Sequence, residues 1–143
     1  MKIKNTMELK LPSLSVNEGF ARSVVGAFAT QLDPTLEEIA DIKTAVSEAV
    51  TNAIVHAYPD KLGEIRVIAS LEDRLISVVI EDKGVGIRDI EQARQPFFST
   101  AGDESRSGMG FTVMETFMDE VNIESAPGQG TTVQMKKMIG AAG

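Results

Sequence analysis

The sequence predicts one α/β domain built as a two-layer sandwich, with a mostly antiparallel sheet and helices on one face. Strand-like segments follow one another across short turns, and neighbours joined in this way pair antiparallel. Two segments with helical periodicity lie between the first and second strands, so helices and strands form separate layers. A chain of 143 residues has the length of one domain, which we assign to residues 1–143.

Five segments have the composition and alternation of β-strands. In the first, apolar residues at positions 7, 9 and 11 alternate with charged ones until Pro12 ends the pattern. The predicted strands are 7–12, 64–70, 75–81 and the two arms of a hairpin within 120–138, which turns at Pro127 and Gly128. Shorter helices are expected over 88–94 and 108–118.

The first predicted helix follows directly after the first strand. Ser15 and Glu18 have the spacing of a capping box, in which each side chain bonds to the backbone of the other residue. The apolar side of this helix is expected to carry Phe20, Val24, Ala27 and Phe28.

The second helix is predicted from Leu36 to His56 and ends before Pro59. Asp33 is expected to cap it, with Pro34 at its first position. At about 100° per residue one apolar stripe is expected, made of Ile39, Ile42, Val46, Ala49, Val50 and Ala53. The opposite side carries Asp41, Thr44, Glu48 and Asn52.

Composition excludes several classes of protein. The formal charge of −7 argues against direct binding of nucleic acid, because a phosphate backbone repels an acidic chain. With no cysteine, the chain has no disulfide and no thiol chemistry, which fits residence in the cytoplasm. No run of residues approaches the roughly 20 apolar residues of a membrane span, so no membrane association is expected.

Glu48 and Asn52 lie one helical turn apart, so their side chains are neighbours. They could form an ordinary solvated polar pair. Asparagine gains little in the middle of a helix, however, and its amide oxygen is a suitable ligand for Mg²⁺.

A second polar group follows the third predicted strand. Asp82 comes at the strand end, and Gly84 and Gly86 follow it in a spacing that fits neither a Rossmann loop nor a P-loop. Turn formation alone would explain one glycine. The alternative is a close approach of the backbone to a flat ligand, with Asp82 accepting a hydrogen bond from an exocyclic amine. Such an acceptor favours adenine over guanine, which presents a carbonyl there.

A second pair of glycines, Gly108 and Gly110, begins the helix predicted over 108–118. Free N–H groups at a helix start favour an anion, although a glycine here can also be a simple cap. Arg106, just upstream, could reach a terminal phosphate or be solvated.

Three stretches occur together in the order and spacing of the GHKL (Bergerat) ATP-binding fold: SEAVTNAIVHA at 47–57, EDKGVGI at 81–87 and SRSGMGF at 105–111. The chain most resembles the anti-sigma factor serine kinases of Gram-positive bacteria, in particular the branch that acts in sporulation. The similarity rests on the longer stretches DIKTAVSEAVTNAIVHAY, DKGVGIRDIEQARQPFFST and RSGMGFTVMETFMDEV, and it covers nearly the whole chain.

The resemblance implies a role for each of these residues. Glu48 would be the general base, Asn52 the Mg²⁺ ligand and Asp82 the contact to the adenine amine. Residues 97–107 would form a lid that brings Arg106 to the γ-phosphate, where it joins Glu48 in catalysis. The further nucleotide-binding residues implied are Gly84, Gly86, Ser107, Gly108, Met109, Gly110 and Thr131. The positions implied to contact protein partners are Arg22 and Glu104.

Members of this family form dimers, hold a sigma factor away from transcription, and phosphorylate a serine on a small anti-anti-sigma protein. The resemblance therefore implies ATP/ADP and Mg²⁺ as ligands, with sigma-F and an anti-anti-sigma factor as partners of a homodimer. Four alternatives stay open: a stress-response anti-sigma kinase, a nucleotide-gated binding module without kinase activity, a histidine-kinase catalytic domain, and a fragment of a chaperone or topoisomerase ATPase.

Overall fold

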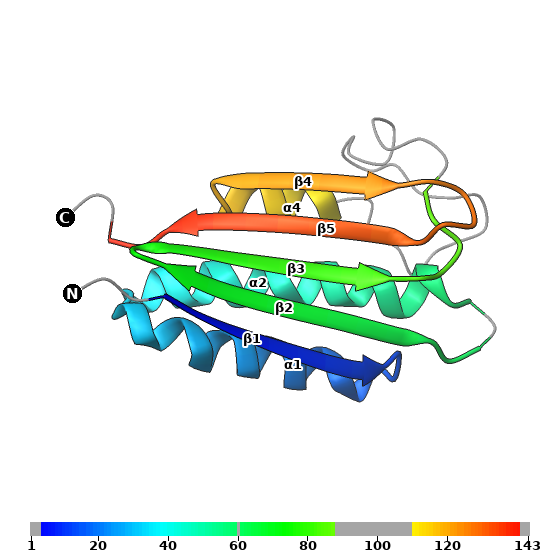
Figure 1. Ribbon diagram of the computed structural model, residues 1–143, viewed down its shortest axis with the longest axis horizontal. Helices are drawn as coiled ribbons and strands as arrows, with labels where there is room; N and C mark the ends of the chain where they lie inside the picture. The colour runs from blue at the N-terminus through cyan, green and yellow to red at the C-terminus, as the bar shows by residue number, and fades with distance from the viewer. Residues whose placement is uncertain (1–3, 60, 88–109, 141–143) are drawn as a thin grey trace.

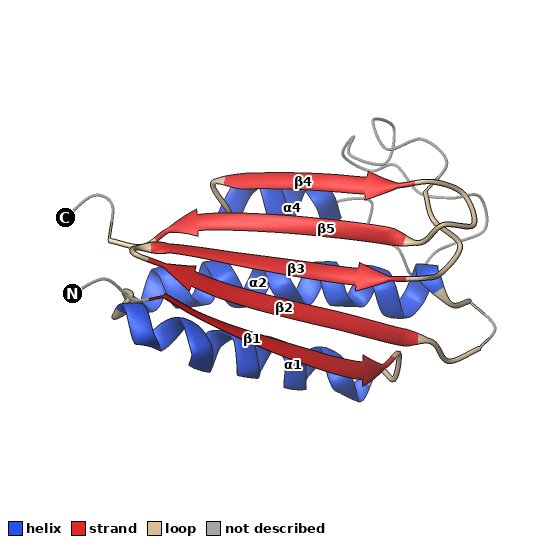
Figure 2. Cartoon of the chain, viewed as in Figure 1, coloured by secondary structure: helices blue, strands red, loops and turns tan. Residues whose placement is uncertain are grey.

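Five strands form one antiparallel sheet, and helices cover one of its faces (Figures 1 and 2). The computed structural model describes residues 4–59, 61–87 and 110–140. The strand order is β1-β2-β3-β5-β4, and every neighbouring pair is antiparallel. The expected two-layer α/β sandwich is confirmed. None of the helices in these residues combines the length and apolar character needed to cross a bilayer.

The strands have bounds close to those expected from the sequence. They are β1 (Lys4–Pro12), β2 (Glu64–Glu72), β3 (Leu75–Asp82), β4 (Glu120–Ser125) and β5 (Thr131–Met138). The helices are α1 (Val16–Ala29), α2 (Leu36–Asn52) and α4 (Gly110–Phe117), with a 3₁₀ turn η1 (Thr30–Leu32) after α1 and a π-helical turn η2 (Ala53–Ala57) after α2. The segment predicted as a helix over 88–94 and the expected lid lie outside the described residues.

The core lies between the sheet and the helices. The strands contribute to it every second side chain, because successive side chains point to opposite faces of the sheet. On β2 and β3 every second side chain is buried, and these are Ile65, Val67, Ala69, Leu71, Ile76, Val78 and Ile80. From α2 the buried residues are Ile42, Ala45, Val46, Ala49 and Val50. Each large aliphatic side chain buried in this way contributes about 1.5–3 kcal/mol of transfer free energy. This packing fixes which side of α2 is left for polar groups.

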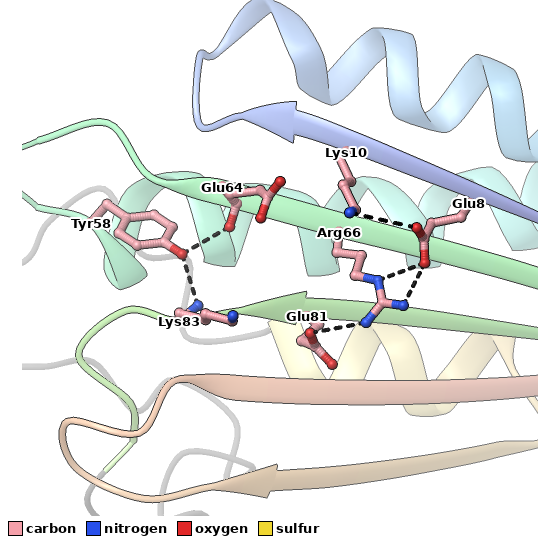
Figure 3. A network of polar contacts seen from close by, with 7 residues as sticks. All are labelled: Glu8, Lys10, Tyr58, Glu64, Arg66, Glu81 and Lys83. Carbon is pink, nitrogen blue, oxygen red and sulfur yellow. Dashed lines mark hydrogen bonds and ion pairs between the residues drawn. The ribbon is translucent and has the colours of Figure 1, made fainter.

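The opposite face of the sheet carries a network of charged side chains. Arg66 on β2 donates through Nε to Glu8 Oε2 at 2.7 Å and lies 3.5 Å from Glu81 Oε1, so one guanidinium connects three adjacent strands (Figure 3). Exposed ion pairs of this kind contribute little to stability. They keep this face solvated.

The expected core face of α1 is correct for Phe28, which packs against the core, but wrong for Phe20 and Ala27, which are exposed. Phe20 is 51% exposed, whereas the buried positions are Ala21, Val25 and Ala29. Small side chains at these positions let α1 pack closely on α2, and this close approach leaves the ring of Phe20 outside the contact.

The predicted capping of both helices is also corrected. Ser15 makes no side-chain cap bond, because Glu18 turns away from it toward Ser47 on α2. The capping box is instead on α2, where Thr35 and Glu38 bond reciprocally at 3.0 and 2.9 Å. Asp33 does not cap α2; it ends η1 in a left-handed conformation with φ of 52°.

Candidate functional site

Two helices bring Glu48, Asn52 and Gly110 to one place. A Cβ added to Gly110 would lie 3.0 Å from Asn52 Nδ2 and 3.5 Å from Glu48 Oε2. Gly110 is the first residue of α4, whose leading N–H groups carry the positive end of the helix dipole. The polar side of α2 therefore faces the start of α4, and a side chain at Gly110 would press closely on the Asn52 amide.

The Asn52 amide is the least satisfied polar group in this part of the structure. Its Nδ2 is buried and has no hydrogen-bond partner among the described residues. Leaving such a group unpaired costs about 1–3 kcal/mol, so a ligand that used the amide would recover that free energy. A half-turn of the planar amide exchanges its oxygen and nitrogen, so either a donor or a metal ligand can be presented there.

The donor set near Asn52 fits Mg²⁺ that arrives with a nucleotide. In the described ranges no group of three or more His, Cys, Asp or Glu side chains could hold a metal ion. Mg²⁺ commonly takes only one or two protein ligands and completes its octahedron with phosphate oxygens and water. Asn52 would supply one of these ligands.

Glu48 is half-buried beside a second carboxylate. Burial raises the pKa of Glu48 above its usual value, and the negative charge of Glu18 raises that pKa further. Glu18 is held by the Ser47 hydroxyl, and its Oε1 lies 3.5 Å from Arg22 NH1. A carboxylate with a raised pKa is a better proton acceptor at neutral pH than an ordinary glutamate.

Arg22, a position implied to contact partners, is connected to the neighbourhood of Glu48. It contacts Glu18, which accepts from Ser47, the residue that precedes Glu48. Its side chain is 43% exposed and pairs with Glu18 across one turn of α1. The side chain can therefore meet a partner while staying next to the site.

Asp82 is a buried carboxylate at the end of β3, with only 8% of its surface exposed. Its Oδ1 accepts from Gly84 N at 2.9 Å, and it pairs in register with Thr131 on β5. Burial raises the pKa of Asp82, whereas hydrogen bonds from the backbone of Gly84 and Thr131 act to lower it. The structure thus brings together Asp82, Gly84 and Thr131, as the resemblance implied.

The glycines after Asp82 are required by close packing and by backbone conformation. A Cβ on Gly84 would overlap the carbonyl oxygen of Ala57, and that oxygen accepts from Val85 N at 3.0 Å. Gly86 has φ of 78°, a left-handed conformation that residues with a side chain rarely adopt. The loop therefore contacts Ala57 at the end of η2, five residues beyond Asn52. This contact connects the two halves of the site: Glu48, Asn52 and Gly110 form one half, and Asp82, Gly84 and Thr131 form the other.

Two hydroxyl groups beside this loop were missed by sequence reasoning. Tyr58 donates to Glu64 O and accepts from Lys83 N, and Ser125 accepts from Ile87 N. Tyr58 ends the stretch DIKTAVSEAVTNAIVHAY but was given no role there, and Ser125 lies outside the quoted stretches; their bonds to Lys83 and Ile87 join segments far apart in the chain, so no local pattern marked them. Of the other expected site residues, Glu104, Arg106, Ser107, Gly108 and Met109 lie outside the described residues.

Comparison with known proteins identifies the family. Residues 12–137 match the family described as the histidine kinase-like ATPase domain. An anti-sigma F factor of Caldanaerobacter subterraneus subsp. tengcongensis is 61% identical over 140 residues, covering 98% of each chain. The anti-sigma F factor of Bacillus subtilis is 52% identical over 138 residues, covering 96% of this chain and 94% of the relative.

Solved structures agree on the fold. The structure of the RsbU and RsbW domains of a Mycobacterium tuberculosis protein superposes with a TM-score of 0.68 at 20% identity, over 94% of this chain and 32% of that one. A blue-light activated histidine kinase domain of Erythrobacter litoralis gives a TM-score of 0.55 at 20% identity, over 85% of this chain and 61% of that chain. The chain therefore belongs to the histidine kinase-like ATPase family and, within it, to the anti-sigma F factors.

Proposed function

We propose that this chain binds and inhibits a sporulation sigma factor, sigma-F, and that it is also a MgATP-dependent protein serine kinase. The kinase substrate is the small anti-anti-sigma protein that opposes it, and phosphorylation inactivates that antagonist. The observation that carries the proposal is the meeting of Glu48, Asn52 and the start of α4, next to the buried Asp82. The protein is proposed to act as a homodimer in the cytoplasm.

The nucleotide would lie between the two halves of the site. Asp82 would accept from the adenine amine, and the positive end of the helix dipole at the start of α4 would attract the phosphates. Mg²⁺, held through Asn52, would neutralise charge on the phosphates. Arg106 and the residues from Ser107 to Met109 are proposed to complete the phosphate contacts.

Glu48 would orient the serine hydroxyl and take its proton. The bond from the γ-phosphorus to the ADP oxygen breaks as the bond to the serine oxygen forms, and the serine proton passes to Glu48 and then to solvent. The transition state of phosphoryl transfer is loose, so positioning and charge neutralisation matter more than base strength. The raised pKa of Glu48 is a modest additional advantage.

The partner surface is proposed to include Arg22 and Glu104. Arg22 is partly exposed and is linked through Glu18 to Ser47, the residue next to Glu48. A partner that engages Arg22 would therefore lie close to the base, which suits a protein substrate whose serine must reach the γ-phosphate.

The test is incubation of the protein with labelled ATP, alone and with a serine-bearing antagonist, together with capture of the sigma factor on immobilised protein. Label on an antagonist serine and retention of the sigma factor are the expected results. Label on His56 would instead indicate a histidine kinase, and release of free phosphate alone would indicate an ATPase. Retention of the sigma factor without any transfer would indicate a binding module.

A further inference from the structure

We propose that Tyr58 and Ser125 are positioning residues that hold the loop 83–87 from two sides and thereby set the affinity of the site for adenine nucleotide. This inference rests on the proposed nucleotide site. It concerns residues that do not touch the reacting atoms.

Tyr58 holds the first end of the loop. Its hydroxyl accepts from Lys83 N at 2.7 Å and donates to Glu64 O at 2.8 Å (Figure 3). The register of β2 and β3 ends at the pair Ile65–Asp82, so Glu64 and Lys83 form the next pair of residues. The hydroxyl bridges the two strands at the point where they separate. It therefore fixes how far the backbone departs from β2 immediately after Asp82.

The sequence makes room for this tyrosine. Its side chain is largely buried, and a Cβ on Gly63 would overlap the ring. The ring is thus pinned between the end of η2 and the start of β2, and the hydroxyl has little freedom to follow a moving loop. A buried hydroxyl with both a donor and an acceptor partner is a rigid support.

Ser125 holds the other end of the loop. Its Oγ, at the end of β4, accepts from Ile87 N at 2.8 Å and donates to Gly130 O at 2.9 Å. Thr131 Oγ1 lies 2.8 Å away, and because the serine proton points to Gly130, the threonine hydroxyl is the donor in this contact. The same serine therefore orients both the loop and Thr131, an expected nucleotide-binding residue.

Backbone bonds occupy the space between these two hydroxyls. Val85 N donates to Ala57 O at 3.0 Å, and Gly128 N donates to Val85 O at 2.7 Å. The N–H of Gly84 is used by Asp82, at 2.9 Å. Movement of the loop would therefore displace the Gly84 N–H, which donates to the Asp82 carboxylate. By holding the loop, the hydroxyls of Tyr58 and Ser125 keep that carboxylate in a fixed orientation.

The experiment measures MgATP affinity by calorimetry for the wild type, Tyr58→Phe and Ser125→Ala. Each variant is expected to raise Kd about 3- to 10-fold, the change that corresponds to the net loss of one hydrogen bond. In the phosphotransfer assay KM for ATP should rise by the same factor while kcat stays within about twofold of wild type, because Glu48 and Asn52 are untouched. If these residues had only a structural role, the variants would contain less active protein, and KM for ATP would not rise independently of kcat.

Thr30→Ala is the control variant. Thr30 Oγ1 donates to Ala27 O at 2.6 Å, so the change removes a hydroxyl hydrogen bond that involves neither the loop nor Gly63, which packs on the Tyr58 ring. Its Kd should equal that of the wild type. Ser125→Thr keeps the hydroxyl and should restore the affinity lost in Ser125→Ala.

The outcomes separate this inference from the function on which it rests. A wild-type protein that binds no MgATP overturns the proposed function and this inference with it. A wild type that binds, together with folded Tyr58→Phe and Ser125→Ala variants whose Kd matches that of Thr30→Ala, overturns the inference alone.

Discussion

Asp82→Asn is the most direct test of how the site recognises adenine. The change replaces one carboxylate oxygen with NH₂, so the shape of the side chain stays the same while one acceptor becomes a donor. Asp82 is only 8% exposed, so little water is available to compensate. The remaining amide oxygen can still accept from Gly84 N, now 2.9 Å from Oδ1, which keeps the loop in place. The loss is therefore expected at the ligand and at the backbone N–H of Thr131, the other donor to this carboxylate.

The magnitude follows from the chemistry of that contact. A hydrogen bond to a charged acceptor contributes about 1.5–3 kcal/mol, which corresponds to a rise in Kd for MgATP of about 10- to 150-fold. The apoprotein should respond differently. Because burial raises the pKa of Asp82, this carboxyl favours folding in its protonated form, and the associated stability is lost as the pH rises through the folded-state pKa. Asparagine does not ionise, so Tm at neutral pH should not fall.

The assay is calorimetric titration with MgATP and MgGTP, with Tm measured on the same samples. Asp119→Asn is the control, because Asp119 also accepts from a backbone N–H, that of Met138 at 2.7 Å, but lies at the other end of β5. The ATP-to-GTP preference should shrink in Asp82→Asn, since an amide NH₂ can pair with the guanine carbonyl. An Asp82→Asn variant that binds MgATP within twofold of Asp119→Asn would refute the adenine assignment.

Three further predictions concern the base and the packing around the site. Glu48→Gln should leave MgADP affinity unchanged in calorimetry and reduce serine phosphorylation about 10²–10⁴-fold, the usual contribution of a general base; undiminished transfer would remove Glu48 from that role. The acid limb of the pH–rate profile should lie above the ordinary glutamate pKa of 4.5, because Glu48 must be ionised and its pKa is raised; Glu18→Gln should move that limb to lower pH, and an unmoved limb would contradict the coupling. Gly84→Ala should lower the free energy of unfolding by about 1–3 kcal/mol in denaturant titration, as overpacking does, whereas Gly19→Ala on α1 should not destabilise.

The sheet could be predicted from sequence because its two faces meet different surroundings. The alternation of buried and partly exposed residues along β2 is a direct consequence of the core on one side and solvent on the other. The core face of α1 could not be predicted in the same way. Hydrophobicity pointed to Phe20, but the distance between α1 and α2 depends on the small residues Ala21 and Ala29, and sequence alone does not give that distance.

Some residues of the site could likewise be predicted from the sequence, and others could not. Asp82 and Gly84 were predictable because they are close in sequence. A carboxylate followed by a glycine at a strand end indicates a hydrogen-bond acceptor beside a close approach of the backbone to a ligand. Tyr58 and Ser125 were not predictable, because their hydroxyls bond to backbone groups 25 and 38 residues away. Almost any segment could supply such a partner. The π-helical turn η2 was also missed, since the predicted helix ran on to His56 without a change of winding.

That turn explains why Gly84→Ala tests more than local packing. The last carbonyls of a helix have no partner within it, and Ala57 O, at the end of η2, is satisfied by Val85 N from the loop after Asp82. The loop thus caps the helix that carries Asn52, and a methyl group on Gly84 would press on that carbonyl oxygen. If the cap positions both halves of the site, Gly84→Ala should weaken MgATP binding as well as stability. A variant that loses stability but keeps wild-type affinity would show that the two halves are held independently.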